Sequence, residues 1–120
     1  MSRSATSYDI GRRAEDAAAN FLQYKKCQIL CRNWRTRYCE IDIIALRQDI
    51  LYFCEVKYRS TPKNGRGLDY ITPKKLRQMR FAAEMWLSRY EYGGHEARLC
   101  AIEVSGLNFQ VTAAVNDITL

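Results

Sequence analysis

Apolar and polar residues recur along the chain with two periods, one typical of helices and one typical of strands. From Gly11 to Tyr24 the apolar positions return every three or four residues, as on the inner face of an amphipathic helix. Asp9 stands where a capping residue is expected. Most of this face is alanine, so we expect the helix to pack closely against a sheet.

A second helical pattern begins at Thr72 and Pro73, residue types preferred at the N-cap and the first position of a helix. It extends to about Tyr90, and Gly93-Gly94 follows as the predicted stop. The positions predicted to face the core are Leu76, Met79, Ala83, Trp86, Leu87 and Tyr90.

Five stretches rich in β-branched and aromatic residues predict strands. They span residues 28–34, 38–46, 50–58, 97–104 and 109–115. The polar segment Arg47-Gln48-Asp49 joins the second and third stretches, which predicts an antiparallel hairpin. The order of helix, three strands, helix and two strands predicts an α/β sandwich in which helices flank a mixed sheet.

The length of 120 residues suits one domain with its own core. Residues 1–8 are polar and without periodicity, so we predict a flexible tail there and a single domain over residues 9–120. Residues 60–71 combine proline and glycine with basic residues, which predicts a loop.

Four charged residues, Glu40, Asp42, Glu55 and Lys57, interrupt the apolar pattern of the predicted hairpin. Side chains alternate between the two faces of a strand, so Glu40 shares a face with Asp42, and Glu55 with Lys57. A turn of two or four residues would place Asp42 opposite Glu55 and Glu40 opposite Lys57. Directly opposed carboxylates about 5 Å apart repel each other and destabilise the strand pair. Another interaction must therefore offset the repulsion.

A divalent cation held by Asp42 and Glu55 would offset this repulsion, because Mg²⁺ prefers carboxylate oxygens, water and substrate phosphate as ligands. The backbone carbonyl of Val56 is a candidate further ligand. Lys57 is a candidate to steer or deprotonate a metal-bound water, or to stabilise charge on a phosphate. The competing interpretation is a cluster of ion pairs on an open sheet face.

The net charge of +6 is concentrated in one segment of the chain. Residues 57–80 contain eight basic residues against one acid, which gives +7. Such a segment predicts a polyanionic partner, with nucleic acid ahead of an anionic membrane. The candidate phosphate contacts are Arg59, Lys63, Arg66, Lys74, Lys75 and Arg77.

No stretch approaches the roughly 18 unbroken apolar residues of a membrane helix, and the first residues lack the apolar segment of a signal peptide. We therefore expect a cytoplasmic protein that does not bind membranes. The five cysteines include no C-x-x-C pair, which favours reduced, partly buried thiols. The alternative is a zinc or iron–sulfur site formed by Cys27, Cys31 and Cys39.

Five segments carry a resemblance to known proteins: GRRAEDAAANFL (11–22), RNW (32–34), EIDIIA (40–45), FCEVKYR (53–59) and ITPKKLRQ (71–78). Together they resemble the small bacterial YraN family, part of the PD-(D/E)XK nuclease superfamily of restriction endonucleases and archaeal Holliday junction resolvases. The resemblance implies a restriction endonuclease-like three-layer sandwich, with Asp42 and Glu55 as metal ligands and Lys57 as the catalytic lysine. It also implies that Glu15 on the first helix is an additional metal ligand or a water-positioning group.

From residues and resemblance together we expect a Mg²⁺-dependent endonuclease, with Mn²⁺ as a substitute, that hydrolyses phosphodiester bonds in DNA. Branched, flapped and single-stranded DNA are the candidate substrates, and resolvases of this superfamily commonly act as homodimers. The alternative is a non-catalytic nucleic-acid-binding protein that retains the nuclease fold. A third hypothesis is a basic protein that docks on other proteins or on anionic lipid.

Overall fold

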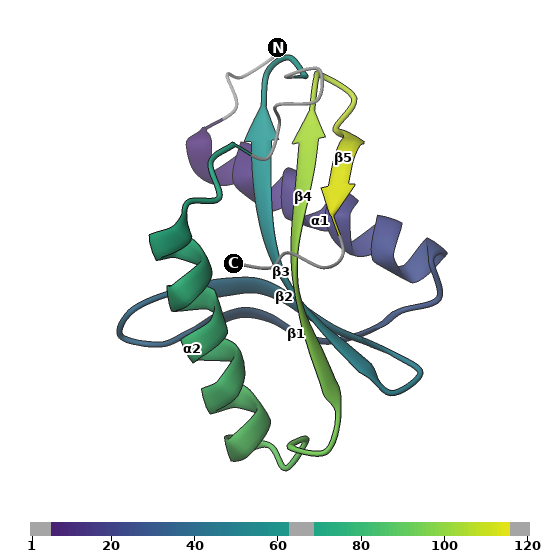
Figure 1. Cartoon of the computed structure of the whole chain (residues 1–120). Coiled ribbons are helices and arrows are strands. Elements are labelled where there is room, and N and C mark those ends of the chain that lie inside the picture. Colours follow the sequence, from purple (N-terminus) through teal and green to yellow (C-terminus); the bar gives the residue numbers. More distant parts are fainter. Residues whose placement is uncertain (1–5, 63–68, 116–120) are drawn as a thin grey trace.

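The computed structural model describes residues 6–62 and 69–115, which fold into two helices and five strands in the predicted order. The elements are α1 (Ser7–Tyr24), β1 (Gln28–Arg35), β2 (Glu40–Arg47), β3 (Ile50–Arg59), α2 (Pro73–Arg89), β4 (Glu96–Ser105) and β5 (Gln110–Val115). The strands form one sheet in the order β1-β2-β3-β4-β5. Neighbours are antiparallel except β3 and β4, which are parallel and are connected through α2 (Figure 1). The predicted α/β fold with a mixed sheet is confirmed.

The two helices cover opposite faces of the sheet, with α1 behind it and α2 in front of it in Figure 1. The alanine-rich face of α1 is confirmed, since Ala14 and Ala18 are buried against Ile43 and its neighbours. Under α2, the fully buried ring of Phe53 meets Trp86 edge-on, with ring centroids 5.8 Å apart. Burial of one such large side chain stabilises the fold by about 1.5–3 kcal/mol. The chain therefore forms three layers with a core on each side of the sheet.

The start of α1 differs from the prediction. Thr6 is the N-cap, and its hydroxyl accepts a 3.0 Å hydrogen bond from the N–H of Asp9. The Asp9 carboxylate in turn accepts from the N–H of Thr6, which completes a capping box. Asp9 is thus the third residue of the helix rather than its cap, and Ser7 and Tyr8 are helical. Their assignment to a tail was wrong.

The start of α2 agrees with the prediction, and its end lies within one residue of the predicted end at about Tyr90, although the glycine pair does not form it. The Thr72 hydroxyl caps the helix by accepting a 3.1 Å hydrogen bond from the N–H of Lys75. The helix ends at Arg89, ahead of the glycine pair, and Glu91 takes the left-handed conformation with φ of 64°. Tyr90 is therefore the C-cap and is 46% exposed rather than part of the core. Neither α1 nor α2, the helices of the described part, is long and apolar enough to cross a membrane.

Candidate active site

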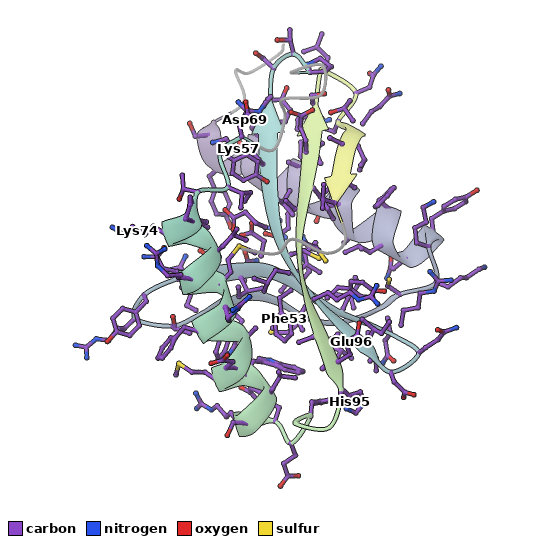
Figure 2. The ribbon with its side chains drawn as sticks, viewed as in Figure 1. Phe53, Lys57, Asp69, Lys74, His95 and Glu96 are labelled. Carbon is purple, nitrogen blue, oxygen red and sulfur yellow. The ribbon has the colours of Figure 1, made fainter. Side chains whose placement is uncertain are left out.

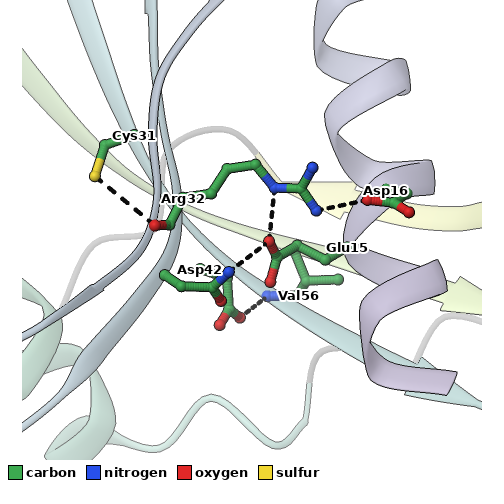
Figure 3. A network of polar contacts seen from close by, with 7 residues as sticks. Glu15, Asp16, Cys31, Arg32, Asp42 and Val56 are labelled. Atoms are coloured by element: carbon green, nitrogen blue, oxygen red, sulfur yellow. Dashed lines mark hydrogen bonds and ion pairs between the residues drawn. The ribbon is translucent and has the colours of Figure 1, made fainter. Parts of the chain in front are cut away.

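Strands β2 and β3 separate at Asp42. Their ladder has the predicted register, and its last pair is Ile43 with Cys54. Beyond that pair the Asp42 side chain replaces a strand partner, because its Oδ2 accepts a 2.7 Å hydrogen bond from the N–H of Val56 (Figure 3). Ile41 packs in the α2 layer whereas Ile43 packs under α1, so the alternation of side chains along β2 is interrupted at Asp42.

The separation of the strands corrects the predicted pairing of charges. Asp42 with Glu55 and Glu40 with Lys57 were expected to be opposed strand partners, but neither pair belongs to the ladder. Glu40 instead pairs with Arg35 on β1, with Nε and Oε2 3.4 Å apart. The carboxylates of the site are therefore brought together by a side-chain hydrogen bond and not by regular pairing.

Asp42 remains close enough to Glu55 for the charge of Glu55 to disfavour the ionisation of Asp42. Burial raises the pKa of Asp42 to about 7, the charge of Glu55 adds to the rise, and the hydrogen bond from Val56 partly opposes it. Burial also raises the pKa of Glu55, against the lowering effects of Lys75 and Lys57. The Lys75 ammonium lies 3.5 Å from Glu55 Oε1. The site thus holds two buried carboxylates whose pKa values both lie above their ordinary values.

Glu15 is held by side chains of β1. Its Oε1 accepts hydrogen bonds from Arg32 Nε at 2.7 Å and from Asn33 Nδ2 at 3.0 Å (Figure 3). Arg32 also donates to Asp16, one residue further along α1, at 2.7 Å. Sequence reasoning assigned no role to Arg32 and Asn33, although both lie in the RNW segment that carries the resemblance.

A cavity of about 680 Å³ lies between α1 and the sheet. Glu15 and Asp42 line it together with Val56, so the structure brings the predicted acid of α1 to the acid of β2. Glu55 and Lys57 are not among its lining residues. Asp42 and Val56 therefore connect this cavity with the Glu55–Lys57 group.

Lys57 and Arg59 lie against one aromatic ring, that of Tyr70. The Lys57 ammonium is 5.9 Å and the Arg59 guanidinium carbon 5.7 Å from the ring centroid. The Tyr70 hydroxyl is buried and has no hydrogen-bond partner among the described residues. Burial and then the charges of Glu55 and Asp42 raise its pKa, so the hydroxyl stays protonated and can donate.

A further acid, Glu103 on β4, was missed from the sequence. Its side chain is buried and lies beside Lys57 in the parallel pairing of β3 with β4. Oε2 forms an ion pair with Arg59 Nε at 3.2 Å, and Oε1 accepts a hydrogen bond from the Thr112 hydroxyl. The available signal was an acid inside the apolar run 97–104.

The candidate phosphate contacts fall into different settings. Arg59 and Lys75 are ion-paired with carboxylates, as described above. Lys74 and Arg77 are exposed on α2 and form no ion pair with the described residues; Figure 2 shows Lys74 pointing away from the sheet. The predicted contacts outside the described residues are Lys63 and Arg66.

The donors of the site fit a lightly held hard cation. Within residues 6–62 and 69–115 no three Cys, His, Asp or Glu side chains converge to hold a metal. Mg²⁺ needs only one or two carboxylates, with water and substrate oxygens as the other ligands. Asp42 and Glu55 supply such a pair, and Val56 lies between Glu55 and Lys57 on the same strand.

The five cysteines are free thiols, as predicted, and all but Cys31 are buried. Cys27 packs under α1 and Cys39 packs in the α2 layer, so these two cannot share a metal ion. The alternative of a zinc or iron–sulfur site using Cys27, Cys31 and Cys39 was wrong. Burial raises the pKa of all three thiols.

The fold and site define a three-layer α/β protein with paired carboxylates where two strands separate. Residues 14–105 match the sequence profile of the family described as "Uncharacterised protein family UPF0102". A UPF0102 protein of Parafrankia sp. (strain EAN1pec) is 43% identical over 86 residues, 72% of this chain and 73% of the relative. One of Chlorobium phaeobacteroides (strain BS1) is 40% identical over 102 residues, 85% and 81% of the two chains. The chain belongs to the UPF0102 (YraN) family, which confirms the resemblance.

Proposed function

We propose that the protein is a metal-dependent endonuclease with a restriction endonuclease-like fold that hydrolyses phosphodiester bonds in DNA. The observation that carries the proposal is the meeting of Asp42 and Glu55, both with raised pKa, beside the exposed Lys57. Burying two neighbouring carboxylates in an apolar sheet costs free energy that their partners offset only in part, whereas a hydrolase that binds a cation requires such a pair.

The two carboxylates and the Val56 carbonyl would hold Mg²⁺, or Mn²⁺ in its place. The ion would supply a Lewis acid for the phosphoryl oxygen and would lower the pKa of a bound water. Lys75 favours the charged form of Glu55 through the 3.5 Å ion pair. Glu15, fixed by Arg32, would orient water in the cavity that it shares with Asp42.

The cations of β3 and the phenol of Tyr70 would act on the phosphate. Lys57 would steer or deprotonate the attacking water, or would stabilise charge on a non-bridging phosphate oxygen. The Tyr70 hydroxyl would donate to such an oxygen, since the described residues leave it without a partner. The N-terminus of α2 and Lys74 would attract the neighbouring phosphates.

The test is incubation of the purified protein with labelled branched, duplex and single-stranded DNA in Mg²⁺ or Mn²⁺. We expect cleavage of at least one substrate and its loss on chelation. Lys57→Ala should fold normally, because Lys57 is exposed, and should not cleave. Lys25→Ala, at the far end of α1, is the matched control and should cleave as the wild type does. Absence of cleavage from the whole panel, or full activity of Lys57→Ala, would overturn the proposal.

A second candidate function is nucleic-acid binding without catalysis. It is favoured by Lys74 and Arg77, which are exposed and have no ion pair within the described part of the chain. Binding of this kind should weaken steeply with salt and survive removal of metal. Absent or salt-insensitive binding would exclude it.

A further inference from the structure

The flank of α2 carries a row of side chains that the proposed chemistry does not use. Lys74, Arg77, Gln78 and Phe81 follow one another at helical spacing and face neither the core nor the paired carboxylates. Tyr38, in the loop between β1 and β2, meets this row. Its ring is perpendicular to that of Phe81, with centroids 5.4 Å apart and an interplanar angle of 84°.

These five residues line a hollow of about 480 Å³. Tyr38 is 57% exposed and Phe81 45%, which is a large aromatic area to leave in water when the core on the other side of α2 is closed. In a perpendicular pair the edge of one ring covers one face of the other. The remaining ring faces stay open to stack against a further planar group.

The charged residues that line the hollow are of one sign. Lys74 and Arg77 line it, and the Arg37 guanidinium lies 6.0 Å from the centroid of the Tyr38 ring. None of the lining residues is acidic. A ligand with planar aromatic faces and repeated negative charge complements this surface, and unpaired nucleotides have both. Duplex DNA presents phosphates but keeps its base faces stacked.

The hollow is also connected to the reaction centre through the first turn of α2. Lys74 lines the hollow, and the adjacent Lys75 is ion-paired with Glu55. Phe81 lies seven residues beyond Lys74, or about 10 Å along the helix axis. A strand stacked on Phe81 and Tyr38 would therefore pass its next phosphates over Lys74 towards Lys57.

We propose that Tyr38 and Phe81, with Lys74 and Arg77, form a stacking site for unpaired bases of DNA next to the scissile phosphodiester. The inference rests on the proposed function and deepens it, because it names DNA with a single-stranded portion as the substrate class. Gln78 offers amide groups to the edge of a stacked base.

The experiment measures binding and needs no cleavage. Fluorescence anisotropy in EDTA compares a labelled oligodeoxythymidine with a duplex of equal length for the full chain. Phe81→Leu keeps an apolar side chain and removes the ring, so we expect affinity for the single strand to fall roughly tenfold and duplex affinity to stay within about twofold. Phe81→Trp should restore single-strand binding. Tyr24→Leu removes an exposed ring at the end of α1 and should change neither affinity.

Three binding results would overturn the stacking site. They are wild-type single-strand affinity in Phe81→Leu, an equal loss for single strand and duplex, and no single-strand binding by the wild type. A shift of the sedimentation coefficient from dimer to monomer in Phe81→Leu would also overturn it, because the rings would then form an interface between two copies. If the wild type cleaves no substrate and Phe81→Leu loses single-strand binding, the stacking site is supported and the proposed nuclease activity is not. If cleavage requires Lys57 but Phe81→Leu binds the single strand as the wild type does, the nuclease activity is supported and the stacking site is overturned.

Discussion

The N–H of Val56 donates a 2.7 Å hydrogen bond to the carboxylate of Asp42. Val56 stands between Glu55 and Lys57, so this one bond holds the acid of β2 beside both proposed active residues of β3. It favours the charged form of Asp42, yet burial and Glu55 outweigh it and the pKa of Asp42 still rises to about 7. The local structure thus maintains a repulsion that the proposed cation would relieve.

Asp42→Asn tests this conflict through stability. The ordinary pKa is 3.8 and the folded-state pKa about 7, so the wild type loses stability as pH rises between those values. Asparagine keeps an oxygen to accept from Val56 and never ionises. We expect the variant to exceed the wild type at pH 8 by about 2–4 kcal/mol and to match it near pH 4. Urea unfolding in EDTA at both pH values measures this. For Asp49→Asn, in the exposed hairpin turn, the difference in stability from the wild type should be the same at both pH values.

Mg²⁺ should stabilise the protein more at high pH than at low pH. The cation competes with the proton on Asp42, so apparent affinity should rise roughly tenfold between pH 6 and pH 8. The melting temperature at fixed Mg²⁺ should therefore increase more at pH 8. Glu55→Gln should abolish most of the increase. Equal shifts at both pH values, or an undiminished shift in Glu55→Gln, would contradict a metal held by these carboxylates.

Tyr70→Phe separates function from folding. The hydroxyl is buried without a partner in the described structure, so its removal should leave stability unchanged or raise it by up to about 1 kcal/mol. Cleavage should fall at least tenfold if the hydroxyl donates to a phosphate oxygen only during reaction. The comparison is kcat/KM beside a thermal melt. A variant that is both less stable and less active would point to a packing role for Tyr70 instead.

Alternation of side chains and the length of one turn were enough to predict most of the fold. They gave the element order, the β2–β3 register and the buried alanine face of α1, because these depend on neighbours in sequence. The ends of the helices were less predictable. The cap of α1 is Thr6 and not Asp9, which is the third residue of the helix. α2 ends at Arg89, and the left-handed residue that follows is Glu91 rather than a glycine.

The site was predictable in composition and not in geometry. Asp42, Glu55 and Lys57 stood out as charges in apolar strands. Regular pairing could not show that β2 pairs with β3 only from Ile43 onwards, which leaves Asp42 outside the ladder. That departure depends on the contact between Asp42 and Val56, which are 14 residues apart. Likewise, the hydrogen bond from Arg32 to Glu15 joins residues that are 17 apart, and no local sequence pattern predicts it.

The buried acid Glu103, which the sequence analysis did not identify, allows a direct prediction about stability. Its side chain is 1% exposed, forms an ion pair with Arg59 and accepts from Thr112. Glu103→Ala removes a buried carboxylate together with its ion pair to Arg59 and its hydrogen bond from Thr112, and loss of such a charged hydrogen-bonded group costs about 1.5–3 kcal/mol. We expect a lower urea midpoint with an unchanged m-value.

Glu96→Ala is the matched control, since that acid pairs with Arg98 on the same strand and its side chain is 55% exposed. Its loss should cost less than about 1 kcal/mol. If the two variants unfold at the same urea concentration, the Arg59–Glu103 pair does not stabilise this end of the sheet. The ion pair also holds Arg59 beside the ring of Tyr70, so DNA cleavage should fall in Glu103→Ala even under conditions where the variant remains folded.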